Sequence, residues 1–406
     1  MAESRNGTRR QVAVVGAGPA GMLLGHMLRQ HGIDVVILER RDRAYVEGRV
    51  RAGVLEQGTV ALLARLGLDR RLKREGLVHS GTVLSVDGEA FRIDFAALTG
   101  GATVTVYGQQ EVMKDLFDAA ETRGLDVVFG AEDLRIEDVE TDTPRLRYRR
   151  HGVDHVVDCD VVAGCDGFHG VSRAAIPAGV LKTFERVYAF GWLGILADVP
   201  PADGELIYCS HARGFALASM RSATRSRYYL QCAAGERVED WPDERFWDEL
   251  CLRLGPEVAS RVTRGPSFEK TVAPLRSFVG EPMRHGRLFL AGDAAHIVPP
   301  TGAKGMNLAV SDVAMLGEAL LDFFEEGSTA GIDGYSARAL ARVWKAERFS
   351  WWFTGLMHRF PDQDPFARRM QVAELDYIRG SRAAQTTLAE NYVGLPMERT
   401  GAANPS

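Results

Sequence analysis

The chain has 406 residues, of which 46% are hydrophobic and 25% charged, a balance typical of a soluble globular protein of two or three domains. The net charge of -5 gives no support to a nucleic-acid or membrane partner, and no apolar run reaches the roughly 18 residues of a transmembrane helix. Five scattered cysteines without a C-x-x-C pair favour reduced thiols and a cytoplasmic protein. We assign no residues to a metal ion.

The first unit of the chain has the pattern of a strand, a glycine-rich turn, a helix and a second strand. These elements are expected at Gln11–Val15, Met22–Gln30 and Asp34–Leu38. Gly16, Gly18 and Gly21 form G-x-G-x-x-G in the turn, and Glu39 closes the second strand about 20 positions later. The glycines let the backbone approach a pyrophosphate, and Glu39 can accept hydrogen bonds from a ribose. We therefore predict a dinucleotide, with NAD and FAD both open at this point.

Two later apolar runs also end in glycine turns, as buried parallel strands do. Asp158–Ala163 leads into Gly164, and Leu288–Ala291 leads into Gly292. A cofactor reached from these turns and from the first one must be long and extended, which favours FAD. The expected fold class is mixed α/β: a Rossmann-like FAD-binding domain interleaved with an antiparallel-sheet substrate domain, followed by a C-terminal helical region.

A rigid loop and a helix start follow the last of these strands. Pro299-Pro300-Thr301-Gly302 bars regular structure, and a helical period begins near Gly305. A helix N-terminus offers free N–H groups and partial positive charge, which suit an anion. A plain connector between strand and helix would show the same local pattern.

Alternating strands rich in aromatic residues begin near residue 181. They are expected at Tyr188–Leu196, Glu205–Cys209, Gly214–Arg221 and Arg227–Cys232. Side chains alternate across a strand, so Ser219 and Arg221 share one face, and Arg227, Tyr229 and Gln231 share a face of the next strand. A hydroxyl, a guanidinium and a phenol can then converge on one carboxylate. The alternative is an internal salt bridge between the arginine and an acidic residue.

These patterns divide the chain into three parts. Residues 1–180 form the FAD-binding domain, with a segment near 75–105 that belongs to the substrate domain. Residues 181–290 form the substrate-binding sheet, and residues 291–406 form a loop that closes over FAD and a helical region. Trp344, Trp351, Trp352 and Phe353 lie close together there, as core or as a subunit contact.

A nicotinamide donor has no second G-x-G-x-x-G available, so it must bind on the surface. Several arginines follow the second strand, and their guanidinium groups favour a 2′-phosphate and hence NADPH, with NADH still possible. An Arg-rich solvated loop is the alternative. The candidates are Arg40, Arg41, Arg43, Tyr45, His169, Arg173 and Arg276.

Several long segments carry a more specific resemblance. They are Gly48–Gln57, Cys165–Gly170, Arg221–Tyr229, Phe289–Asn307, Trp344–Trp352 and Glu390–Pro396. On these segments the chain resembles the single-component flavoprotein aromatic hydroxylases, which use one FAD and a nicotinamide donor. The resemblance implies that Arg227 steadies the flavin, and it implies further contacts with FAD. These are Glu39, Arg49, Val50, Arg51, Ala52, Gly53, Val54, Gln109, Asp293, Met306 and Asn307.

The resemblance also implies a reaction. It is the ortho-hydroxylation of 4-hydroxybenzoate to 3,4-dihydroxybenzoate by O2 through a flavin C4a-hydroperoxide, with NADPH as donor. Ser219, Arg221 and Tyr229 would hold the substrate carboxylate, and Met220 would also bind the substrate.

At the other end of the substrate, Tyr208 would bind the phenol oxygen, and the proton would pass through Tyr392 to His79 near solvent. The Pro300 carbonyl would face the ring hydroxyl position. Ionising a phenol of pKa about 10 near pH 7.5 costs roughly 3 kcal/mol, which two or three hydrogen bonds to the anion can supply.

Three alternatives stay open at this stage. They are the same chemistry on another hydroxy- or aminobenzoate, a flavin-dependent reductase without oxygen activation, and a non-catalytic FAD-holding protein. The pair Arg221 and Tyr229 argues against the reductase, and the intact trio Tyr208, Tyr392 and His79 argues against a non-catalytic protein. The resemblance further implies a homodimer with its interface in the C-terminal region.

Overall fold

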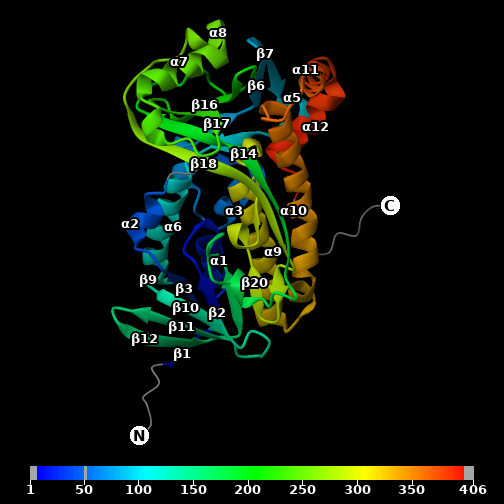
Figure 1. Ribbon diagram of the computed structural model, residues 1–406. Coiled ribbons are helices and arrows are strands. Elements are labelled where there is room, and N and C mark those ends of the chain that lie inside the picture. Colours follow the sequence, from blue (N-terminus) through cyan, green and yellow to red (C-terminus); the bar gives the residue numbers. More distant parts are fainter. Residues whose placement is uncertain (1–6, 50–52, 397–406) are drawn as a thin grey trace.

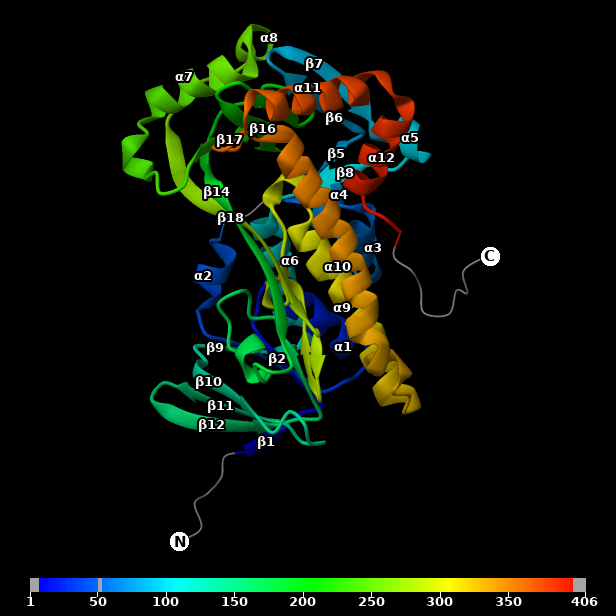
Figure 2. The same ribbon diagram turned by 45° about the vertical axis from the view of Figure 1, so that its right-hand side comes forward.

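The computed structural model describes residues 7–49 and 53–396. A lower lobe is built on a six-stranded sheet and an upper lobe on an eight-stranded sheet (Figure 1). Helix α10 (Ala330–Met357) and the long strands β14 (Lys182–Ala197) and β18 (Ser267–Glu281) run from one lobe into the other (Figure 2). The two lobes therefore share three long elements.

The lower sheet has the strand order β19-β20-β13-β2-β3-β9, and every neighbouring pair is parallel except β19 with β20. Val12, Ala13 and Val14 of β2 are fully buried, as expected for a central strand of a covered parallel sheet. The elements of this lobe are β2 (Val12–Val15), β3 (Val35–Glu39), β9 (Asp126–Phe129), β13 (Val161–Gly164), β19 (Arg284–His285), β20 (Leu288–Leu290), α1 (Pro19–Gln30), α6 (Gln109–Arg123) and α9 (Gly305–Glu326). The predicted α/β fold class is confirmed.

The upper sheet has the order β21-β18-β14-β17-β16-β15-β6-β7. Its neighbours pair antiparallel, except that β15 pairs parallel with β6. The remaining elements are β6 (Gly81–Val86), β7 (Glu89–Asp94), β15 (Ile207–His211), β16 (Gly214–Ser222), β17 (Arg225–Ala233), β21 (His296–Ile297), α7 (Asp243–Leu254) and α8 (Pro256–Ala259). Helix α7 packs its apolar side chains on one face of this sheet, which leaves the other face for the polar residues described below.

Several features of the fold differ from those predicted. The run Asp158–Ala163 is divided between two sheets, because one strand ends at Asp158 and β13 begins at Val161. Strand β18 was not predicted, since only a few of its residues are buried and its pattern is irregular. Strand β20 lies in the lower sheet although it falls within residues 181–290, and β21 belongs to the upper sheet although it falls after residue 290. The division into domains as a whole stays a prediction.

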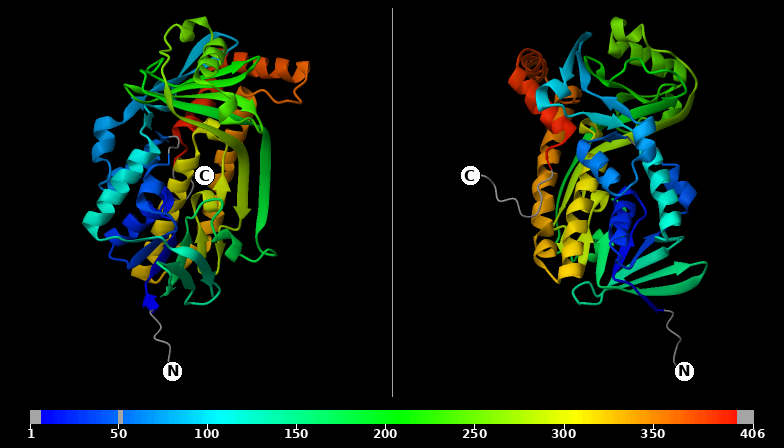
Figure 3. Two further views of the ribbon diagram at one scale, coloured as in Figure 1. Left: turned by 60° about the vertical axis from the view of Figure 1, so that its left-hand side comes forward. Right: turned by 180° about the vertical axis from the view of Figure 1, so that it is seen from behind.

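Smaller elements complete the fold. Helices α9 and α10 pack side by side, and a small four-stranded sheet lies at the foot of the molecule near the first described residues (Figure 3). The bounds are β1 (Gly7–Arg9), β10 (Glu132–Glu137), β11 (Arg145–Arg150) and β12 (Val153–Asp158) in that sheet; β4 (Val54–Leu55), β5 (Leu77–His79) and β8 (Val104–Val106) in a three-stranded sheet; and α2 (Arg43–Glu47), α3 (Gln57–Arg65), α4 (Arg70–Glu75), α5 (Phe95–Thr99), η1 (Arg173–Ala175), η2 (Val238–Asp240), η3 (Gly292–Ala294), η4 (Pro300–Gly302), α11 (Pro365–Gly380) and α12 (Arg382–Val393). Among the described residues, no helix has both the length and the apolar character needed to cross a bilayer.

Candidate active site

The three glycine turns predicted to hold FAD lie side by side at the carboxyl edge of the lower sheet. Backbone hydrogen bonds of 2.8–3.0 Å join the turn at Gly16 to β3, the turn at Cys165 to β2 and the turn at Ala291 to β13. Open parallel sheets bind their ligands at this edge. The fold thus offers one extended site to a cofactor that is as long as FAD.

Each glycine of the first turn is needed for a different physical reason. Gly16 has φ +101°, and a Cβ there would lie 2.5 Å from the Cys165 carbonyl oxygen. A Cβ on Gly21 would lie 2.0 Å from the Gly16 carbonyl oxygen. At Gly18 a Cβ would meet nothing within 4 Å, and no side chain caps the N-terminus of α1 that begins after it. Open space beside uncapped N–H groups fits the pyrophosphate of a dinucleotide.

Glu39 is held at the same edge by the backbone. One carboxylate oxygen accepts the Ala17 N–H at 2.9 Å, and the other accepts the Arg41 N–H at 2.8 Å. Each carboxylate oxygen has further lone pairs, so Glu39 can still accept a ribose hydroxyl. It is the residue at which we predict the ribose to lie.

The start of α9 is tied to the N-terminal part of the chain through Asn307. Its side-chain amide donates to the Val54 carbonyl at 2.8 Å, and its side-chain oxygen accepts the Glu56 N–H at 2.9 Å. Met306 is half-buried beside it, and Asp293 is exposed in the turn η3. The N-terminus of α9 has no side-chain cap, so its free N–H groups suit the anionic reduced flavin.

The other residues predicted to contact FAD differ in their burial and in their hydrogen-bond partners. Gly53 is buried, and its carbonyl accepts the Tyr107 N–H at 2.7 Å. Gln109 is half-buried at the first position of α6, and the exposed Arg49 donates to the Tyr45 hydroxyl at 3.0 Å. Three further predicted contacts lie outside the described residues: Val50, Arg51 and Ala52.

One face of the upper sheet carries the predicted substrate residues. Tyr208 of β15 lies opposite Leu217 of β16, and Leu217 lies opposite Tyr229 of β17. Ser219 of β16 lies opposite Arg227 of β17. Directly opposed residues of antiparallel strands point to the same face. Tyr208, Ser219, Arg227 and Tyr229 therefore share the face that α7 leaves uncovered.

Arg221 stands at a β-bulge beside this group, where the register shifts between Met220 and Ser222. It is half-buried, one guanidinium N–H donates to the Met220 carbonyl at 3.0 Å, and its Nε has no partner among the described residues. Burial and the nearby Arg227 lower the pKa of Arg221, whereas the Tyr229 hydroxyl raises it. No carboxylate of the described chain pairs with Arg221, so the alternative of an internal salt bridge finds no support there.

Arg227, in contrast, has a carboxylate partner, although its Nε, like that of Arg221, has no partner among the described residues. Its guanidinium binds Glu269 Oε1 at 2.6 Å and Thr271 Oγ1 at 2.9 Å, and it lies over the Tyr229 ring at 5.0 Å. Ser219 donates its hydroxyl to the Arg227 carbonyl at 2.7 Å. Of the two arginines, only Arg221 lacks a carboxylate partner among the described residues.

The hydroxyl oxygens of Tyr208 and Tyr392 lie 2.7 Å apart. Both residues are buried, and burial raises the pKa of each phenol. The Tyr392 ring stacks on Phe95 at 4.8 Å, which fixes its orientation. Met220 is buried in the same apolar cluster. The pair therefore presents two neutral hydroxyls in contact, which can pass a proton between them.

His79 does not lie near solvent, and this prediction is wrong. The residue is only 2% exposed, because β5 pairs with β8 and turns the imidazole inward. Neither ring nitrogen has a hydrogen-bond partner among the described residues, and burial lowers the pKa of the imidazole. A histidine after Leu-Val in the sequence gives no signal of this burial.

The prediction that Pro299–Gly302 bars regular structure is wrong in part, because Pro300–Gly302 form the short 3-10 helix η4. Pro300 is exposed, and its carbonyl accepts the Ala303 N–H at 2.9 Å. The Thr354 hydroxyl on α10 donates to the Thr301 hydroxyl at 2.9 Å. The Pro300 carbonyl keeps one lone pair for a ring hydroxyl.

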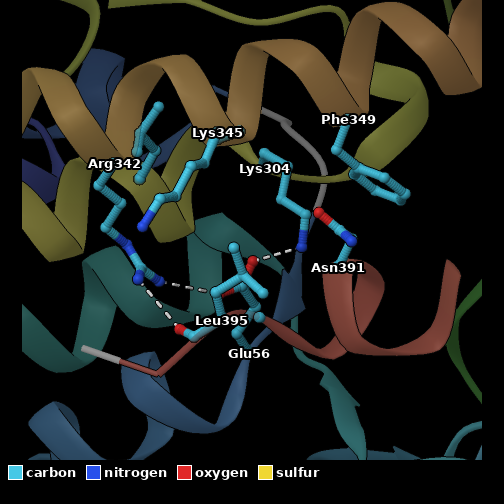
Figure 4. Close-up of a pocket in the computed structure, with 10 residues that line it drawn as sticks. Glu56, Lys304, Arg342, Lys345, Phe349, Asn391 and Leu395 are labelled. Atoms are coloured by element: carbon cyan, nitrogen blue, oxygen red, sulfur yellow. Dashed lines mark hydrogen bonds and ion pairs between the residues drawn. The ribbon is translucent and has the colours of Figure 1, made fainter. Parts of the chain in front are cut away.

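A buried ion cluster that sequence reasoning missed lies against the backbone of Tyr392 and lines a small cavity (Figure 4). Lys304 Nζ lies 2.6 Å from Glu56 Oε1 and donates to the Tyr392 carbonyl at 2.9 Å. Arg342 lies 3.7 Å from the other Glu56 oxygen and donates to the Leu395 carbonyl at 3.0 Å. The cluster holds the segment that carries Tyr392. These residues are distant in the sequence, so no local pattern joins them.

The predicted nicotinamide residues form two groups. In the first, the guanidinium groups of Arg41 and Arg49 lie over the Tyr45 ring at 5.0 and 5.6 Å, and Arg40 is exposed. Arg43 does not belong to it, because its guanidinium is paired with acidic residues. These are Glu47, Asp118 and Glu121.

The second group surrounds Phe168. The guanidinium groups of Arg173 and Arg276 lie 4.7 and 4.4 Å from its ring centre, and His169 is exposed beside it. Arg173 also donates to the carbonyls of Phe168 and Ala294, so it contributes to packing. Arg276 lies 3.1 Å from Glu185 at the surface. Among the described residues, no hydrogen bond or ion pair joins the two groups.

Comparisons with known proteins agree with this arrangement. Residues 9–350 match the FAD binding domain family. The chain is 56% identical over 390 residues to the p-hydroxybenzoate hydroxylase of Acinetobacter baylyi, with 96% of each chain covered. It is 27% identical to a probable NADH-specific resorcinol 4-hydroxylase of Rhodococcus jostii, over 75% of this chain and 57% of that protein. The crystal structure of p-nitrophenol 4-monooxygenase PnpA from Pseudomonas putida superposes with a TM-score of 0.79 at 20% identity, over 96% of this chain and all of that one. The chain therefore belongs to the FAD binding domain family and is a flavoprotein monooxygenase of the aromatic hydroxylase type, with FAD as cofactor and NAD(P)H as reductant.

Proposed function

We propose that the enzyme hydroxylates 4-hydroxybenzoate at the position ortho to the hydroxyl, giving 3,4-dihydroxybenzoate, with O2 and NADPH consumed. One observation carries this proposal. Arg221, which has no carboxylate partner among the described residues, lies at the end of β16, and the pairing of β15, β16 and β17 places Tyr208 and Tyr229 on one face of the same sheet. An acid group at one end and a phenol at the other suit these two residues. The Acinetobacter relative, named p-hydroxybenzoate hydroxylase, supports the same substrate.

The role of Arg221 is to bind the carboxylate of the substrate. A planar guanidinium binds carboxylate through two hydrogen bonds, and a half-buried guanidinium without a counter-ion gains most from such a partner. Tyr229 lies next to this guanidinium and can donate its hydroxyl to the same carboxylate. Ser219 can join them only if its hydroxyl leaves the Arg227 carbonyl.

The role of Tyr208 and Tyr392 is to take up the proton of the substrate phenol. FAD, once bound and reduced by the nicotinamide, activates O2 for transfer to the ring, and an electron-rich phenolate accepts this oxygen best. The phenol proton passes to Tyr208 as that residue gives its own proton to Tyr392 across 2.7 Å. Because both tyrosines are neutral and buried, neither competes with the substrate as the anion.

We propose that His79 ends this relay inside the protein, although no hydrogen bond joins it to Tyr392 among the described residues. Its lowered pKa means that the imidazole is neutral at pH 7, so it can accept a proton. Both ring nitrogens are free of partners among the described residues, which leaves one for the relay and one for the way out.

We propose two groups for the nicotinamide, the one around Tyr45 and the one around Phe168, with the arginines favouring a 2′-phosphate. We also propose a cytoplasmic homodimer. All five cysteines are free thiols, which supports the compartment. Trp344 and Trp351 on α10 are 41% and 50% exposed, which supports a contact on that helix, whereas Phe353 is fully buried and belongs to the core.

The proposed substrate is tested by product analysis across 4-hydroxybenzoate, 3-hydroxybenzoate and 4-aminobenzoate, with oxygen uptake followed. We expect one 3,4-dihydroxybenzoate per O2 with the first compound and little product with the others. Equal coupled turnover of 3-hydroxybenzoate would contradict the proposal.

A further inference from the structure

One buried carboxylate holds the turn that follows β20. A single oxygen of Asp312, on α9, accepts the Gly292 N–H at 2.9 Å and lies 2.5 Å from His296 Nε2. Asp312 and His296 are each 1% exposed. Gly292 is the first residue of η3, and His296 follows the end of η3 by two residues. The Asp312 carboxylate therefore links the two ends of this turn.

The pair also joins an edge strand of the upper sheet to α9. His296 belongs to β21, where it lies opposite Val279 of β18 in the upper sheet. Asp312 lies on α9, which packs against α1 beside the lower sheet. A charge-assisted hydrogen bond between these elements fixes the upper sheet to the helix whose N-terminus is expected to face the flavin.

Other contacts leave this turn little freedom. The buried Tyr335 of α10 donates to the Leu290 carbonyl at 2.8 Å, Arg173 donates to the Ala294 carbonyl at 2.9 Å, and the Gly280 N–H donates to the Ala295 carbonyl at 2.8 Å. These bonds fix the carbonyl groups of the segment. Asp312 binds the N–H of Gly292 and the His296 side chain instead.

We infer that Asp312 and His296 are positioning residues for FAD: their ion pair sets the turn that presents Asp293 before the cofactor arrives. Asp293 is exposed on the outer side of the turn, whereas the pair lies buried on the inner side. Neither residue needs to touch the cofactor. A turn ordered in advance binds a ligand more tightly, because less freedom is lost on binding. The inference needs only FAD, and does not depend on which aromatic acid is the substrate.

The test dilutes holoenzyme over a range from micromolar to nanomolar and follows the fluorescence of released FAD. The variants are Asp312→Asn, His296→Leu and His296→Gln. The control is Glu318→Gln on the same helix, which removes a surface carboxylate 3.7 Å from Arg65. We expect the FAD Kd to rise by about 10-fold or more in the first two, because a buried charge-assisted bond is lost.

The glutamine variant separates positioning from packing. The amide side chain of glutamine can still donate to Asp312, so the FAD Kd of His296→Gln should stay within about threefold of that of the natural protein. The FAD Kd of His296→Leu should rise beyond this range. The visible circular dichroism of bound FAD at saturation should change in Asp312→Asn and stay unchanged in Glu318→Gln.

Two results would overturn the inference. One is a His296→Leu protein that retains FAD as well as the natural chain. The other is an equal loss of FAD in His296→Gln and His296→Leu, which would show that the volume of the imidazole, and not its bond to Asp312, matters. If Asp312→Asn does not fold, the two His296 variants still decide the question.

Discussion

The hydroxyl oxygens of Tyr208 and Tyr392 lie 2.7 Å apart, although the residues are 184 positions apart in the chain. Tyr208 comes from the upper sheet and Tyr392 from the last described helix, α12. Lys304 holds the Tyr392 carbonyl from the other side. The upper sheet, the loop that carries Lys304 and helix α12 therefore meet at the hydroxyl pair of Tyr208 and Tyr392.

Replacing Tyr208 by Phe should leave the Kd of 4-hydroxybenzoate within about threefold and lower kcat for hydroxylation by tenfold or more. The reason is that the proton relay is lost while the guanidinium site is intact. The loss should shrink as the pH rises towards about 10, where solvent ionises the phenol without help. Stopped-flow hydroxylation rates from pH 6.5 to 9.5 measure both effects.

The control for this change is Tyr228→Phe, which removes a fully buried hydroxyl from the opposite face of the same sheet. It should leave kcat unchanged. Full activity of Tyr208→Phe at pH 7 would reject the relay.

Arg221→Ala should raise the Kd of 4-hydroxybenzoate more than tenfold, because the substrate carboxylate loses a half-buried guanidinium that has no other acidic partner among the described residues. Arg221→Lys should recover only part of this loss, since an ammonium cannot bind both carboxylate oxygens in the same plane. Equilibrium titration of flavin absorbance measures the Kd.

Arg225→Ala serves as control, because Arg225 lies on the same hairpin and pairs with Asp198 at the surface. Its effect on the Kd should be below twofold. An unaltered Kd in Arg221→Ala would make that arginine a structural residue.

Much of the fold follows from local patterns. The glycine turn at Gly16 and the strands around it are readable from the sequence, because β-branched runs and glycines act over a few residues. The alternation of side chains also places Ser219 on one face of its strand and Arg227 on one face of the next. The structure adds that these two faces coincide, which depends on the register of the pairing.

The rest of the site depends on contacts that no local pattern encodes. His79 is buried because of strands that come later in the chain, and Lys304 meets Glu56 across 248 positions. The bulge at Arg221 arises from a register shift, which alternation alone cannot reveal. Arg43 was a candidate for binding the nicotinamide donor, but acidic side chains of another helix pair with its guanidinium.

The nicotinamide site predicts a preference for NADPH over NADH in kcat/KM. Arg276→Ala should raise the KM for NADPH severalfold, because a guanidinium beside Phe168 at the surface is lost. Arg43→Ala should leave the ratio of the two donors unchanged, since its guanidinium is committed to acidic partners. Initial rates with both donors measure these quantities. A clear preference for NADH would reject the use of the arginines proposed here.

Glu347 predicts a pH dependence of stability. Its carboxyl is buried on α10, and burial raises its pKa to about 7, whereas hydrogen bonding from Ser277 and the charge of His296 act in the opposite direction. Tyr188 is the other titratable group that faces it.

Between its ordinary value of 4.5 and about 7, the unfolded chain has released the Glu347 proton and the folded chain still binds it. The free energy of unfolding must therefore fall as the pH rises through this window, by about 1.4 kcal/mol per unit. From pH 6 to pH 8 the natural holoenzyme should lose roughly 1.4 kcal/mol through this group, and Glu347→Gln should lose less by that amount. The raised pKa of His296 acts in the same direction, and the Glu347 charge contributes to it, so the difference between the two proteins reports Glu347 together with its coupling to His296. Urea unfolding of both holoenzymes at the two pH values measures it, and equal losses would show that the carboxyl titrates outside this range.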